Sequence, residues 1–110
     1  MKNIFTQIGA ALDGEQFDDL LKNDQLRIER IVSNGQASPP DFWYDQDQNE
    51  WVVVLEGAAG LEVDHNGKVE TVTLERGDCF LLPAGRRHRV AWTSEREKTV
   101  WLAVWWPENG

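Results

Sequence analysis

The stretch GDCFLLPAGRRH, residues 77–88, decides the predicted fold. It combines a turn at Gly77, a short apolar strand and a corner made by Pro83 and Gly85. Proline lacks a backbone N–H and so ends the strand, while glycine permits the positive φ that a tight corner needs. Such a corner sets the direction of the side chain that opens the next strand, which is His88. His88 is therefore the first candidate functional residue.

Short strand-like segments separated by turn signals fill most of the remaining chain. The clearest turn is Asn66-Gly67, a dipeptide typical of two-residue hairpin loops. The expected strands cover residues 26–33, 50–57, 59–64, 69–74, 79–83, 88–93 and 99–106. Regularly spaced short strands favour an all-β antiparallel sandwich or barrel. We predict a single domain over residues 1–110, with the barrel at 26–106 and a short tail at 107–110.

One segment near the N-terminus predicts a helix instead. Asp13 precedes residues 15–22, in which Phe17, Leu20 and Leu21 occur at helical spacing. We expect residues 1–25 to form a helical segment that packs outside the barrel or covers one of its open ends.

Composition excludes several classes of partner. The chain has 110 residues and a formal net charge of -8, which repels a phosphate backbone and an anionic membrane surface. Its longest apolar runs are far shorter than the roughly 20 residues of a membrane span, and its first residues are too polar for a signal peptide. Cys79 is the single cysteine, so no intrachain disulfide can form. We expect a cytoplasmic protein that binds neither nucleic acid nor membranes.

Two of the expected strands are apolar on both faces. Residues 51–55 and 100–106 do not alternate with polar residues as a strand with one wetted face would. One face would line the interior of the barrel, so the other needs a cover. A second copy of the chain is the favoured cover, which predicts a homodimer; the N-terminal segment packed over this face is the alternative.

At this point a family resemblance can be stated. Residues 77–92 resemble the second sequence motif of the cupins, with Gly77, Pro83, Gly85 and His88 at the matching positions. Trp92 stands where the family has an asparagine, and Glu50 and Gly57 match the end of the first motif. The resemblance covers about residues 28–106 and implies a small single-domain cupin, a double-stranded β-helix or jelly roll. It also implies that Glu50 and His88 point into the barrel.

The first motif departs from the pattern of metal-binding cupins. These usually carry a His-x-His pair before the glutamate, at positions that here hold either Trp43 and Asp45 or Tyr44 and Gln46. A site of His88, Glu50 and a loop carboxylate, Asp45 or alternatively Asp47, could still hold Fe(II), Mn(II) or Zn(II). The other histidine, His65, lies in a turn that we expect to be solvated.

Three functions are compatible with these residues. The favoured one is binding of a small, anionic or neutral molecule in the barrel, with Glu50, His88, Trp92, Tyr44 and Arg86 as ligand-binding candidates. A second is an oxygenase or isomerase, either metal-dependent or metal-free with His88 as general base, Tyr44 as proton donor and Glu50 beside them. A third is a non-catalytic barrel in which Glu50 and His88 simply satisfy each other.

Overall fold

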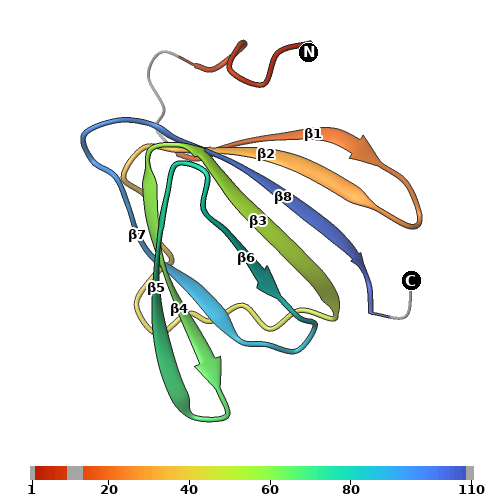
Figure 1. Cartoon of the computed structure of the whole chain (residues 1–110), viewed down its shortest axis with the longest axis vertical. Helices are drawn as coiled ribbons and strands as arrows, with labels where there is room; N and C mark the ends of the chain where they lie inside the picture. Colours follow the sequence, from red (N-terminus) through yellow and green to blue (C-terminus); the bar gives the residue numbers. More distant parts are fainter. Residues whose placement is uncertain (1, 10–13, 109–110) are drawn as a thin grey trace.

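The computed structural model describes residues 2–9 and 14–108, and within them every regular element is a β-strand (Figure 1). The strands are β1 (Gln16–Lys22), β2 (Arg27–Ser33), β3 (Gln48–Glu56), β4 (Ala58–His65), β5 (Lys68–Glu75), β6 (Cys79–Leu82), β7 (His88–Thr93) and β8 (Thr99–Pro107). The all-β prediction is confirmed. In the described residues no helix is long and apolar enough to span a membrane.

The strands form two antiparallel sheets. The larger sheet has the order β1-β2-β8-β3-β6, and the smaller has the order β5-β4-β7. Figure 1 shows the two sheets splayed apart from the point where β3 passes into β4. That passage occurs at Gly57, where φ is 83° and a Cβ would lie 2.5 Å from Oγ1 of Thr99. A side chain has no room there, which explains why this position of the first motif is glycine.

The predicted N-terminal helix is wrong, because residues 16–22 form strand β1 instead. β1 pairs with β2 along its whole length, and a register shift between Asp19 and Leu21 breaks the alternation of side chains. This irregularity produces the apolar spacing that resembled a helix. Hydrogen bonds to the next strand of the hairpin therefore override a local helical pattern. Asp13, the first residue of that pattern, lies outside the described residues, as do 109–110 of the predicted tail.

The core lies between the facing surfaces of the two sheets. Its buried members come from β3, β4, β5, β6 and β8: Val52, Val54, Ala59, Leu61, Val63, Leu74, Leu82, Trp101, Ala103 and Trp105. They occur at alternating positions along each strand, as side chains on one face of a sheet must. Apolar surface removed from water here supplies the main driving force for folding.

The outer face of the larger sheet is partly covered by the N-terminal segment. Arg30 of β2 is fully buried there, and its guanidinium donates to the carbonyl oxygens of Ile4, Thr6 and Gln7 at 2.5–3.1 Å. It also forms an ion pair of 2.7 Å with Asp18 of β1. One buried cation therefore holds residues 4–7 against β1 and β2.

The corner at residues 83–88 has the predicted geometry. Gly85 has a φ of 79°, and its N–H donates to the carbonyl oxygen of Gln46 at 2.7 Å. The N–H of Ala84 donates to Oδ1 of Asn49 at 2.9 Å. The corner that aims His88 is thus tied to the segment that leads into β3.

Candidate functional site

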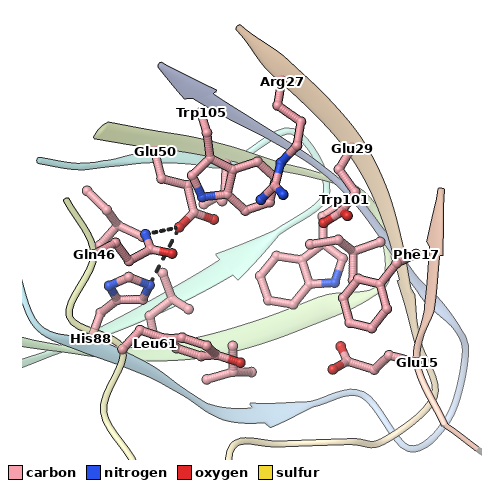
Figure 2. A pocket seen from close by; sticks show the side chains of 15 residues that line it. Glu15, Phe17, Arg27, Glu29, Gln46, Glu50, Leu61, His88, Trp101 and Trp105 are labelled. Atoms are coloured by element: carbon pink, nitrogen blue, oxygen red, sulfur yellow. Dashed lines mark hydrogen bonds and ion pairs between the residues drawn. The ribbon is translucent and has the colours of Figure 1, made fainter. Parts of the chain in front are cut away.

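A cavity of about 230 Å³ opens between the two sheets (Figure 2). Both sheets and the segment before β3 contribute its lining. The lining residues are Glu15, Phe17, Arg27, Glu29, Ile31, Tyr44, Gln46, Glu50, Val52, Leu61, Leu82, His88, Val90, Trp101 and Trp105. Eight of these fifteen side chains are aliphatic or aromatic hydrocarbons or tryptophans and seven are polar or charged, so the cavity has apolar walls and more polar groups than most small-molecule sites.

Glu50 and His88 meet at one side of this cavity. Nε2 of His88 lies 3.6 Å from Oε1 of Glu50, and the two residues are only 5% and 7% exposed, respectively. The amide of Gln46 donates to the same Oε1 at 2.9 Å. Figure 2 shows these three side chains together, with Phe17 and Glu15 across the cavity. The structure therefore brings together the two residues that the corner and the resemblance predicted to converge.

The hydrogen bonds of His88 leave Nε2 as its reactive nitrogen. Nδ1 lies 3.1 Å from the carbonyl oxygen of Arg86, which can only accept, so Nδ1 carries a proton. Nε2 is then free to exchange a proton with the cavity or with Glu50. Burial raises the pKa of Glu50 above its ordinary value of 4.5, although Gln46 and His88 oppose the rise.

Tyr44 and Gln46 enter the cavity because their segment runs beside β7. Tyr44 and His88 exchange backbone hydrogen bonds of 2.7 and 3.1 Å, and their rings stack with centroids 5.4 Å apart. Gln46, two residues further, faces the same side. Burial, followed by the charges of Glu15 and Glu50, raises the pKa of Tyr44 above 10.0, so its hydroxyl stays protonated.

The cavity also contains charged residues that sequence analysis missed. Arg27 and Glu29 point inward from β2, and the guanidinium of Arg27 lies over the ring of Trp105, 4.0 Å from its centroid. Glu15 accepts from the hydroxyl of Ser33, which in turn accepts from Nε1 of Trp101 at 3.1 Å. Burial raises the pKa of Glu29 against the charge of Arg27. The sequence pattern of residues 27, 29 and 31 does not by itself identify the face with Arg27 and Glu29 as the inner one.

Two of the predicted ligand-binding residues lie outside the cavity. Trp92 is 40% exposed and packs on the outer face over Gly60, where its ring occupies the space that a Cβ would need. A register shift between Gly60 and Leu61 breaks the alternation that predicted Trp92 beside His88. Arg86 contacts the ring of His65 at the end of β4 and does not line the cavity.

The two other arginines beside His88, Arg87 and Arg89, are paired with acidic residues. Arg87 lies 3.4 Å from Asp64, and Arg89 pairs with Glu62, so both bind acidic side chains of the neighbouring strand β4. His65 also has a partner, because its Nε2 lies 2.7 Å from Glu70.

The donor set does not fit the metal centre that the resemblance implies. Asp45 and Asp47 are exposed, and neither lines the cavity. Tyr44 and Gln46, which stand in place of the histidine pair, line it instead. In the described part of the chain, no three histidine, cysteine or acidic residues gather closely enough to hold a metal ion. The NH2 group of Gln46 donates a hydrogen bond to Glu50, so Gln46 offers only an amide oxygen and not the imidazole nitrogen that Zn and Fe prefer. One imidazole and one carboxylate remain, fewer than three protein ligands.

Comparisons with known proteins agree with this architecture. The profile of the family described as "Cupin domain" matches residues 29–105. The crystal structure of a candidate mannose-6-phosphate isomerase from Ralstonia eutropha is 48% identical, with a TM-score of 0.90 and 97% of each chain covered. A cupin superfamily protein from Desulfitobacterium hafniense (16% identity, TM-score 0.73, 91% of this chain and 84% of that one) shares the fold. KdgF from Halomonas also shares the fold, with 17% identity, a TM-score of 0.73, and 90% of this chain and 85% of that chain covered.

Proposed function

Because the chain belongs to the cupin domain family, we propose that it binds a small hydroxylated molecule between its sheets, with Glu50 and His88 as the polar anchor. The observation that carries this proposal is the Glu50–His88 pair at 3.6 Å, buried from bulk water but lining the cavity. A carboxylate accepts from hydroxyl groups, and an imidazole can donate or accept. Both partners therefore suit a ligand rich in hydroxyls.

The dimensions and walls of the cavity favour a ligand of monosaccharide size. Its volume of about 230 Å³ lies below the range of roughly 300–1,000 Å³ that holds drug-sized ligands. Trp101, Trp105 and Phe17 provide flat apolar surfaces against which the C–H faces of a sugar-like molecule can pack. The 48% identical structure described as a candidate mannose-6-phosphate isomerase supports the same class of ligand.

A second candidate function is isomerisation of such a molecule, favoured by the free Nε2 of His88 beside a carboxyl group of raised pKa. His88 would take the proton from the hydroxyl-bearing carbon next to a carbonyl, giving an enediolate. Return of that proton to the former carbonyl carbon would complete the exchange, while the hydroxyl proton moves to the former carbonyl oxygen. Tyr44, whose hydroxyl is protonated and whose ring stacks on that of His88, would donate a hydrogen bond to the carbonyl oxygen of the ligand.

Binding measurements on matched variants test the proposal. Mannose and mannose 6-phosphate are titrated into the wild type, His88→Asn, Glu50→Gln and the control His65→Asn, with tryptophan fluorescence and calorimetry as readouts. We expect about tenfold weaker binding in both cavity variants, since each loses charge-assisted hydrogen bonds, and unchanged binding in the control. Conversion of mannose 6-phosphate to its ketose isomer, lost in His88→Asn, would establish the second candidate.

The structural alternative makes the opposite prediction. If Glu50 and His88 only satisfy each other, neither sugar binds at millimolar concentration and each substitution merely lowers the free energy of unfolding. That result would overturn the proposed function.

A further inference from the structure

We propose that Arg27 binds the anionic group, a carboxylate or a phosphate, of the ligand held by Glu50 and His88. This inference rests on the proposed function and specifies the ligand class, a hydroxylated molecule with one anionic end. It assigns to β2 the anion recognition that the sequence had suggested for Arg86.

The position of Arg27 is set by the pairing of the larger sheet. Arg27 opens β2 and lies opposite Trp105 of β8 in the register of the two strands. Its guanidinium lies over the indole ring, 4.0 Å from the ring centroid, and both residues line the cavity. Figure 2 shows the side chain of Arg27 reaching inward from β2, with its guanidinium over the ring of Trp105. Stacking on an aromatic ring holds the planar group in one orientation while leaving its edge free.

The donors of this guanidinium have no acceptor within the described residues. Nε is buried and without a hydrogen-bond partner, and no carboxylate of residues 2–9 or 14–108 lies within 4.0 Å of Arg27. Arg87 and Arg89 differ from Arg27, because each is paired with an acidic residue of β4. An arginine with its hydrogen-bonding edge unused, in a cavity, matches the fork geometry of a carboxylate or a phosphate.

The acidic residues of the cavity limit how much negative charge a ligand can carry. Glu15 is engaged by the hydroxyl of Ser33, and Glu50 by Gln46 and His88, so neither forms a direct ion pair with Arg27, although the charge of Arg27 acts on Glu50. Glu29 faces the same cavity two residues from Arg27 on β2, and the charge of Arg27 acts on it, so Glu29 opposes any anionic group and leaves room for one at most. The arrangement suits a ligand with one anionic group at Arg27 and neutral hydroxyls elsewhere.

Three probes with one carbon skeleton test the role of Arg27: mannose, mannonate and mannose 6-phosphate. Each is titrated into the wild type, Arg27→Gln, Arg27→Lys and the exposed control Arg76→Gln, with tryptophan fluorescence as the readout. We expect one anionic probe to bind the wild type more tightly than mannose does. Arg27→Gln should weaken that probe about tenfold or more, leaving mannose nearly unchanged. Arg27→Lys should be intermediate, because an ammonium retains charge without the bidentate fork.

The outcomes separate this inference from the proposed function. Preference for the phosphate over the carboxylate, or the reverse, identifies the anionic group. If neither anionic probe binds more tightly than mannose, or if Arg27→Gln weakens all three equally, the role of Arg27 is overturned. The proposed function survives that result as long as mannose binds and His88→Asn weakens it. Absence of binding by all three probes at millimolar concentration overturns both. Circular dichroism of each variant verifies the fold, and Arg27→Lys replaces Arg27→Gln should the latter fail to fold.

Discussion

Nε2 of His88, at the start of β7, lies 3.6 Å from Oε1 of Glu50 in β3, so this pair joins the two sheets across the cavity. β3 belongs to the larger sheet and β7 to the smaller one, so the two residues meet only because the sheets face each other. The contact depends on two local devices. The corner at Gly85 aims His88, and the bond from Gln46 holds the carboxyl group of Glu50.

The raised pKa of Glu50 predicts a particular pH dependence of stability. Burial raises this pKa above 4.5, so the folded chain binds more protons than the unfolded chain in that range. Stability from this group is present at lower pH and is lost as pH rises through the raised pKa. Glu50→Gln should flatten this decline, with part of the slope remaining because burial also raises the pKa of Glu29. The free energy of unfolding, measured in urea between about pH 4 and pH 8, gives the slope of this decline. The exposed control Glu75→Gln should retain the wild-type slope; a Glu50→Gln curve parallel to the wild type would contradict the assignment.

Gly57→Ala should be strongly destabilising. The new Cβ would meet Oγ1 of Thr99 at 2.5 Å and its Cα at 2.7 Å, and φ is 83°. The strain at this φ and the displacement of the backbone at Thr99 should together lower the free energy of unfolding by at least about 2 kcal/mol. Gly77→Ala is the matched control, because it has a similar φ of 89° but no atom within 4 Å of the added Cβ. Equal losses for the two variants in urea unfolding would show that the close approach to Thr99 contributes nothing.

Replacing Tyr44 and Gln46 should create the metal centre that this chain does not provide. Both side chains line the cavity beside Glu50 and His88, so Tyr44→His with Gln46→His would supply three imidazoles and one carboxylate. We expect the double variant to bind one Zn(II) per chain by calorimetry, and the wild type to bind none stoichiometrically. Trp43→His with Asp45→His tests the other spacing and should bind no better than the wild type. Stoichiometric Zn(II) on the wild type would contradict this prediction.

The homodimer remains a prediction, and the outer face of the larger sheet is its proposed interface. Leu81 is 51% exposed there, on the same face of the sheet as Trp51 and Val104. A charge at this face should oppose association, so Leu81→Glu should yield monomers by light scattering where the wild type is dimeric. Val69→Glu, at a residue 47% exposed on the smaller sheet, is the control and should stay dimeric. A monomeric wild type at high micromolar concentration would refute the dimer.

Local sequence signals predicted much of the candidate site. Gly77, Pro83 and Gly85 specify their corner through backbone preferences that need no partner strand. The direction of His88 follows from that corner, and the seven strands between turn signals follow from composition and periodicity.

The errors at residues 16–22, at Trp92 and in the first motif occur where pairing between strands decides the outcome. Residues 16–22 became a strand because β2 offered its backbone edge. Trp92 points outward because of a register shift between β7 and β4. The pairing of Tyr44 with His88 places Tyr44 and Gln46 in the cavity, in place of Trp43 and Asp45. Side chains alternate with a period of two, so one shifted residue exchanges the inner and outer faces of a strand.

The sequence by itself determined that this chain is a β-sheet protein of the cupin type, and that Glu50 and His88 are its leading polar candidates. Only the tertiary structure decided which other groups join them, above all Arg27 over Trp105. Turns are encoded by the conformational limits of neighbouring residues. The interior of a cavity is set by the register between strands distant in the chain, which only the assembled sheets define.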